Sequence, residues 1–139
     1  MAKELQLKIN RSVAGGLVGI GKTVLTITCD LVIDFQKVIP KNLVNARVVL
    51  GEVRVPDIQV IAIEADQDAT VFFNKPGSSV PTDSLSLKAD KPVVWVAGDQ
   101  SSMKFVTVDF DDLWITTGVN DTLLKVICAQ DSTPTLADI

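Results

Sequence analysis

Apolar and polar residues alternate with a period of two along residues 24–36. Every odd position from 25 to 35 is apolar, and the even positions are polar except for Val24 and Val32. Successive side chains of a β-strand point to opposite faces, whereas a helix would scatter these residues around its circumference. The pattern predicts one long half-buried strand over 23–36, or two strands joined by a bend, with the odd-numbered face buried.

Residues 4–10 show the same alternation, again with apolar residues at odd positions. They predict a second strand, antiparallel to the one at 23–36. The residues between the two strands, 14–22, are rich in glycine, which tolerates the positive φ angles of tight turns. We expect a mobile loop tip here, or a contact loop that orders on assembly. The candidate interface residues of this loop are Gly16, Gly19 and Gly21.

Residues 16–23, GLVGIGKT, match G-x-x-x-x-G-K-[ST], the phosphate-binding loop of many nucleotide hydrolases. That loop needs a helix directly after its Lys-Thr pair, because the amides of the helix N-terminus hold the phosphates. Here β-branched residues in strand period follow instead. No Asp at the end of a buried parallel strand is placed to hold magnesium either. We therefore expect no nucleotide binding.

The rest of the chain consists of short apolar segments separated by turn residues. The further strands that we expect cover 43–50, 59–65, 70–73, 84–87, 93–96, 104–110, 113–116 and 123–129. The turns that we expect lie at 74–81, 89–92, 98–102 and 118–121, and one helical turn is expected within 39–46. Strands at such spacing are typical of an antiparallel sandwich or barrel.

The predicted fold class is therefore all-β: a jelly-roll-like antiparallel β-sandwich of about eight to ten strands with almost no helix. We expect a single domain over 1–139, with a loose C-terminal tail at 132–139.

Charge and composition narrow the function. The chain has a net charge of −4 at pH 7, and 47% of its residues are apolar. The acidic balance disfavours nucleic acid and anionic membranes as partners. No apolar run approaches the roughly 20 residues that span a bilayer, and the alternating start does not resemble a secretory signal. We expect the apolar excess to enter a core, subunit interfaces, or both.

The chain contains few of the residues and motifs that enzymes commonly use for catalysis, so we expect neither enzymatic activity nor a cofactor. The chain has no His and no Tyr, and no G-x-S-x-G occurs in it. Two acidic clusters stand out, one of Asp109, Asp111 and Asp112 and the other of Glu64, Asp66 and Asp68. We interpret both as solvated strand ends. A weak calcium site at the first cluster is the alternative, although the glycine and distal Glu of a calcium loop are missing.

The cysteines and tryptophans occur within apolar stretches. Cys29 and Cys128 are expected to be buried thiols of a reduced cytosolic protein, and a disulfide between them stays open. Trp95 and Trp114 have apolar neighbours, which favours the core or a subunit interface over an exposed sugar-stacking face. Trp114 is thus a further interface candidate.

A resemblance covers residues 84–131. A K-P-V-V-W strand is followed by a turn, by V-D-F-D-D-L-W-I-T, by a small polar turn and by a final T-L-L-K-V-I strand. This order of strands and turns resembles that of small β-rich virion structural proteins of tailed bacteriophages. The resemblance implies a structural role in the virion, as a capsid decoration or cement protein, or as a tail or adaptor component. It carries over no catalytic residues.

We therefore expect a virion protein, made in the host cytoplasm, whose partners are its own copies and other virion proteins such as the major capsid protein. A homo-oligomer, with a trimer favoured, agrees with the closed symmetry that identical interfaces require. A non-enzymatic sugar- or peptide-binding β-sandwich module is the alternative.

Overall fold

The computed structural model describes residues 3–12, 19–79, 82–97 and 104–131, with side chains from Cys29 onward. This part of the chain is almost entirely strand. The only helix in it is one short 3-10 segment, η1 (Val55–Asp57). The strands are β1 (Lys3–Ser12), β2 (Gly19–Cys29), β3 (Leu31–Ile39), β4 (Ala46–Val53), β5 (Ile58–Ala65), β6 (Ala69–Phe73), β7 (Asp83–Leu87), β8 (Val93–Val96), β9 (Phe110–Thr117) and β10 (Thr122–Gln130).

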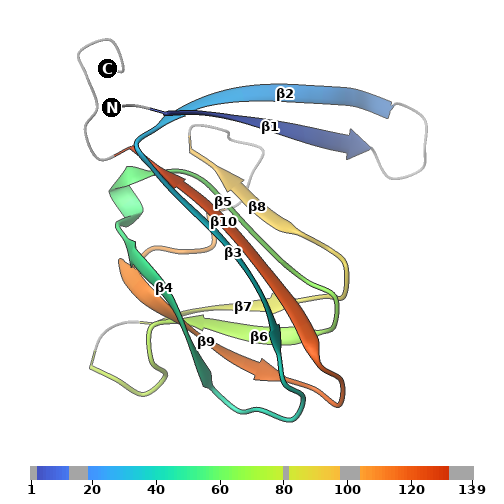
Figure 1. Ribbon diagram of the computed structural model, residues 1–139, viewed down its shortest axis with the longest axis vertical. Coiled ribbons are helices and arrows are strands. Elements are labelled where there is room, and N and C mark those ends of the chain that lie inside the picture. Colours follow the sequence, from blue (N-terminus) through green and yellow to red (C-terminus); the bar gives the residue numbers. More distant parts are fainter. Residues whose placement is uncertain (1–2, 13–18, 80–81, 98–103, 132–139) are drawn as a thin grey trace.

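Two four-stranded antiparallel sheets form a sandwich (Figure 1). One sheet has the order β3-β10-β5-β8 and the other the order β4-β9-β6-β7. Inward residues alternate with outward ones along most strands, so Val71 and Phe73 of β6 are fully buried while Thr70 and Phe72 are only partly buried. The all-β antiparallel sandwich predicted from the period-two pattern is confirmed.

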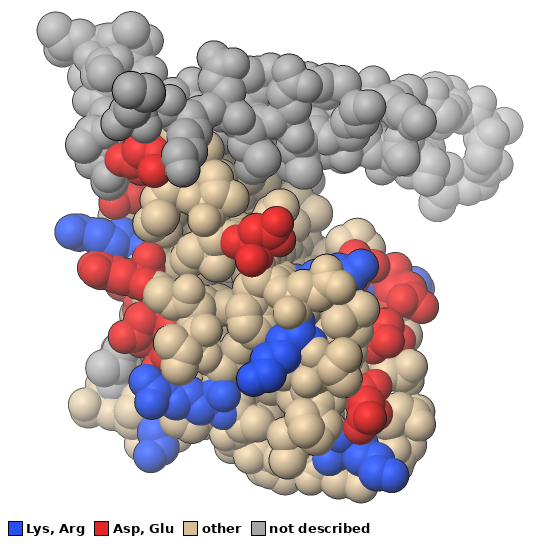
Figure 2. Space-filling view, viewed as in Figure 1, with Lys and Arg blue, Asp and Glu red and all other residues tan. Residues whose placement is uncertain are grey.

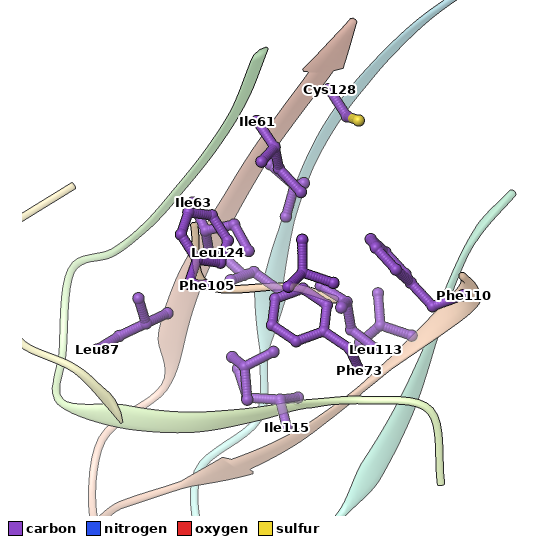
Figure 3. Packing of buried hydrophobic residues seen from close by; sticks show 14 of the residues in the cluster. Ile61, Ile63, Phe73, Leu87, Phe105, Phe110, Leu113, Ile115, Leu124 and Cys128 are labelled. Atoms are coloured by element: carbon purple, nitrogen blue, oxygen red, sulfur yellow. The ribbon is translucent and has the colours of Figure 1, made fainter. Parts of the chain in front are cut away.

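The core lies between the two sheets and contains side chains from both (Figure 3). Phe73 is at its centre: its ring lies 4.9 Å from the Phe110 ring in an edge-on arrangement and 6.0 Å from the Phe105 ring. Such tilted aromatic pairs are favoured because the positive edge of one ring meets the negative face of another. Ile61, Ile63 and Leu113 are each 0% exposed and complete the packing.

The alternating segment 23–36 is two strands rather than one. A bend at Asp30 separates β2 from β3, which is the second of the two arrangements that the pattern predicts. The bend also interrupts the buried face. Ile33 and Phe35 pack against the core, but Cys29 joins a second apolar cluster and Leu31 is 47% exposed. The odd-numbered residues therefore do not share one buried face. The side chains of residues 25–28 lie outside the described part.

The second apolar cluster lies on the outward face of the β3-β10-β5-β8 sheet. It joins Cys29 to Val60, Val96 and Ala129, all of which are nearly or fully buried. Their strand neighbours Ile61 and Cys128 belong to the main core on the inward face. This sheet therefore buries apolar side chains on both faces at the end where β2 contacts β5.

The expected strand over 104–110 is wrong. Residues 104–107 form no strand, and β9 begins only at Phe110, continuing through the expected 113–116 strand. Phe105 and Val106 are nonetheless buried in the core. The segment is held by the Asp83 carboxylate, which accepts hydrogen bonds from the Thr107 amide at 2.7 Å and from its hydroxyl at 3.0 Å. A buried irregular segment thus gives the same apolar sequence pattern as a strand.

The helical turn expected within 39–46 is also wrong. Asn42 and Asn45 have φ angles of 58° and 50°, which are left-handed and incompatible with a right-handed helical turn. The connection between β3 and β4 is instead tied to the start of the β9–β10 connection. The buried Thr117 hydroxyl accepts a hydrogen bond from the Leu43 amide at 3.0 Å and donates one to the Pro40 carbonyl at 2.7 Å.

Strands β1 and β2 form an antiparallel hairpin that is a sheet of its own. In Figure 1 the hairpin crosses one end of the sandwich and extends to one side of it. Gly19 and Gly21 lie in β2, so the expected glycine-rich loop at 14–22 is wrong for residues 19–22. Gly16, with residues 13–18, and the expected loose tail at 132–139 lie outside the described residues.

Candidate functional site

The outward face of the β4-β9-β6-β7 sheet carries two adjacent aromatic residues. Phe72 of β6 and Trp114 of β9 are direct cross-strand partners, and both are partly buried. Their strand neighbours Val71, Leu113 and Ile115 are 0% exposed on the inward face. Period-two alternation therefore places Phe72 and Trp114 on the outside of the sandwich. Of the two positions expected for Trp114, the core is wrong and a subunit interface stays a prediction, and Phe72 is a site residue that the sequence pattern did not single out.

Polar residues surround this aromatic pair. Arg47, the cross-strand partner of Trp114 on β4, donates a hydrogen bond from Nε to Asp112 Oδ2 at 2.8 Å. The Lys75 ammonium lies 5.9 Å from the centre of the Trp114 ring, near the outer limit of a cation–π contact. In the next row of the sheet, Thr116 donates to the Asn45 side chain at 3.2 Å. Aromatic surface and hydrogen-bonding groups thus lie side by side.

The first acidic cluster does not form a calcium site. Asp109 Oδ1 accepts a hydrogen bond from the Val55 amide at 2.8 Å, which fixes the start of η1. Asp112 is occupied by Arg47, and Asp111 is exposed. These carboxylates line an open groove of about 530 Å³ beside the aromatic pair. The partners of Asp109 and Asp112 lie in different elements, η1 and β4, so these two carboxylates are held by separate contacts.

The second acidic cluster is likewise divided among structural contacts. Asp66 Oδ1 accepts a hydrogen bond from the Leu123 amide at 2.8 Å, and Asp68 Oδ1 accepts one from the Ala89 amide at 2.8 Å. Glu64 lies opposite Lys125 in the pairing of β5 with β10. Within the part of the chain that the structure describes, no three His, Cys, Asp or Glu side chains are grouped to hold a metal ion.

The nucleotide-like motif has no phosphate-loop geometry at its Lys-Thr end. Lys22 and Thr23 lie inside β2, which continues to Cys29. The prediction that a strand follows the motif is therefore confirmed. A phosphate loop would require a helix N-terminus at this point.

Several large apolar side chains remain exposed on the sandwich. Val44 is 78% exposed and Val119 is 77% exposed, on two connections that are joined by a hydrogen bond from the Asn42 amide to the Gly118 carbonyl. Val49 and Val38, on edge strands β4 and β3, are 63% and 58% exposed. Basic and acidic side chains are interspersed on the face seen in Figure 2, and the described residues there form no broad basic surface of the kind that binds nucleic acid.

Both cysteines are buried. They lie on opposite faces of the β3-β10-β5-β8 sheet, with Cys128 in the core between the sheets and Cys29 in the outward cluster. A disulfide between them would have to pass through the sheet, which the short reach of such a bond forbids. Burial raises the pKa of the Cys128 thiol to about 12.

This raised pKa predicts a loss of stability at alkaline pH. The folded state keeps Cys128 protonated up to about 12, whereas the unfolded thiol ionises near its ordinary pKa of 9.0. Cys128 therefore makes its full contribution to the free energy of unfolding below the ordinary pKa of 9.0, and this contribution falls as the pH rises toward about 12. Urea unfolding across this range should show a steeper decline for the native chain than for Cys128→Ala. Equal slopes would contradict the prediction.

In the described residues, no helix is both long and apolar enough to cross a membrane. Comparison of the chain with protein-family models, curated proteins and solved structures found no match.

Proposed function

We propose that this chain is a non-enzymatic structural subunit of a virion, a capsid decoration protein, which assembles as a homo-oligomer through its β1–β2 hairpin. The observation that carries the proposal is that the hairpin joins neither four-stranded sheet. A two-stranded ribbon is marginally stable by itself in water. A partner that covers one of its faces would supply the missing burial.

The register of the hairpin pairs apolar residues of the two strands with each other. Leu7 lies opposite Leu25, and Leu5 lies opposite Ile27, whereas the pair between them, Gln6 and Thr26, is polar. Because alternate positions of paired strands belong to opposite faces, this sequence pattern predicts an apolar face over the two apolar pairs. Such faces on neighbouring copies can pack against one another.

The strand orders of the sandwich support the same class of function. In each sheet, strands that are distant in sequence are neighbours, as β3 and β10 are in one sheet and β4 and β9 in the other. These orders support the expected jelly roll, in which eight strands form two Greek keys. Jelly rolls recur in viral capsid proteins and in lectins, so the fold by itself favours both a virion role and a sugar-binding role.

The resemblance of residues 84–131 to small virion proteins of tailed bacteriophages favours the virion. Exposed valines at the loops and at the edge strands add surface for neighbouring subunits. We propose a trimer, because capsid surfaces offer three-fold and quasi-three-fold positions to small sandwiches and closed symmetry satisfies identical interfaces. The major capsid protein is the further partner that a decoration role requires. A tail or adaptor position in the virion is the second candidate.

The test exchanges one cross-strand pair on the apolar face for a charged pair. The variant Leu7→Lys with Leu25→Glu places opposite charges across the ribbon, which preserves cross-strand pairing while removing the apolar face. The matched control, Gln6→Lys with Thr26→Glu, makes the same change one residue along, on the other face. Mass photometry and sedimentation of the purified chains measure the oligomer. We expect trimers for the native chain and the control, and monomers for the apolar-face variant.

A native chain that remains monomeric at all concentrations would overturn the proposal of homo-oligomeric assembly. Trimers in both variants would show that the hairpin does not carry the interface. Binding of the native trimer to particles that lack it, measured by co-sedimentation, tests the virion role separately.

A further inference from the structure

We propose that the outward face of the β4-β9-β6-β7 sheet is a saccharide-binding surface, with Trp114 and Phe72 as its stacking platform. This inference goes beyond the structural role, because it concerns a face of the sandwich that the hairpin does not form. Four features support it: the pairing of the two rings, the polar rows beside them, the anchoring of Arg47 and the size of the exposed apolar area.

The two rings occupy adjacent positions on neighbouring strands. Phe72 and Trp114 are direct partners across β6 and β9, and the inward residues on either side of them are fixed in the core. The rigid sheet therefore holds both aromatic side chains on one outward face. A pyranose ring presents several C–H groups on one side, and such a surface packs against an aromatic face. Two adjacent aromatic residues can accept consecutive sugar units.

Hydrogen-bonding groups lie in register around the rings. In the row of the two aromatics, the sheet places Arg47 beyond Trp114 and Ser84 beyond Phe72. The adjacent row contains Thr116 and its partner Thr70, with Ser86 beyond Thr70. Hydroxyl groups both donate and accept, as sugar hydroxyls do. The combination of an apolar platform and a few oriented polar groups is what small-ligand recognition requires.

Arg47 is oriented before any ligand arrives. Its Nε is bonded to Asp112 Oδ2 at 2.8 Å, and the Asp112 side chain is only 12% exposed while that of Arg47 is 56% exposed. The bond leaves the other guanidinium N–H groups as donors toward solvent. A side chain fixed in this way loses less conformational entropy when it binds a hydroxyl. The pair also neutralises the Arg47 cation.

The exposed aromatic area matches a small ligand in size. Phe72 and Trp114 are both partly buried, so two rings of this size expose on the order of 100 Å² together. A stable protein interface needs about 800 Å² per partner. A nucleic acid would require several cations, but this aromatic row has only Lys75 besides the neutralised Arg47. One or two sugar units match the area and the charge.

The experiment uses a glycan microarray of neutral and acidic glycans, followed by calorimetric titration of the full chain. The titrants are soluble β-1,4-linked oligosaccharides of glucose and of N-acetylglucosamine, a mannan and an oligogalacturonate, together with any glycan that the array retains. We expect binding in the micromolar to millimolar range. Trp114→Ala and Phe72→Ala should each weaken it by about tenfold or more, and Trp114→Phe should retain most of it.

The control variant is Trp95→Phe, which removes the other indole from β8 in the opposite sheet. It should bind as the native chain does. No binding to any array or titrated glycan at millimolar concentration would overturn the proposal, and so would binding that survives Trp114→Ala. A change of oligomeric mass in Trp114→Ala or Phe72→Ala would identify this face as a contact between subunits, which also overturns it. Because the assembly test concerns the hairpin, the two proposals fail independently.

Discussion

Val71→Asp should abolish folding of the chain. Val71 is 0% exposed between the two sheets, and its neighbours in the core are apolar. An unpaired carboxylate at this position would either remain charged in an apolar environment or require protonation. Either outcome costs at least about 4 kcal/mol, a large part of the roughly 5–15 kcal/mol that stabilises a domain of this size. Expression as insoluble protein, or a circular dichroism spectrum without strand signal, would confirm the prediction.

The matched control is Thr70→Asp, one residue away on the same strand. Thr70 points outward and lies between the polar residues Thr116 and Ser86, so a carboxylate there stays hydrated. Its cost should be within about 1 kcal/mol in urea unfolding. Equal loss of folding in both variants would mean that this outward face is as dry as the core, contrary to the described arrangement.

Much of the fold was predictable because a strand that is buried on one face has alternating apolar and polar residues in its own sequence. The alternation in 23–36 indicated strand over helix and even offered two strands with a bend as an alternative. The place of the bend, at Asp30, and the change of face that follows it depend on contacts with β5 and β10. Those contacts join residues far apart in the sequence, and periodicity contains no information on them.

Residues 104–107 show why the sequence pattern does not distinguish a buried irregular segment from a paired strand. Phe105 and Val106 are buried like strand residues, but the Thr107 amide bonds to a carboxylate 24 positions away instead of to a neighbouring strand. The acidic triplet at 109–112 has the same explanation. Asp109 and Asp112 have partners 54 and 65 positions away, so spacing along the chain did not show that contacts with distant elements hold these carboxylates.

Part of the aromatic pair could be predicted from the sequence. Leu113 and Ile115 flank Trp114 in the expected strand 113–116, and with these two residues inward strict alternation places Trp114 outward, as the structure has it. The expectation for Trp114 was based on its apolar neighbours instead of on this alternation. The pairing of Trp114 with Phe72 required the β6–β9 register, which the sequence does not contain. The aromatic pair on this face therefore became visible only with the sheet topology.

Phe73→Ala should destabilise the sandwich by about 3–5 kcal/mol, because it removes a buried ring and leaves a cavity. Phe73 is 0% exposed and contacts both Phe105, from the irregular segment, and Phe110, at the start of β9. Loss of the Phe73 ring should therefore destabilise residues 104–107, which no strand pairing holds in place. Urea unfolding gives the free energy, and hydrogen exchange should show faster exchange at residues 104–110 before the rest of the sheet.

The matched control is Phe72→Ala, which removes the same side chain from the outward face. Because Phe72 is partly exposed and leaves no enclosed cavity, its cost should stay near or below about 1 kcal/mol. The comparison separates two roles of adjacent phenylalanines on one short strand: Phe73 stabilises the core, and Phe72 serves the outward face. A cost for Phe72→Ala as large as that for Phe73→Ala, measured at a concentration where the chain is monomeric, would contradict this division.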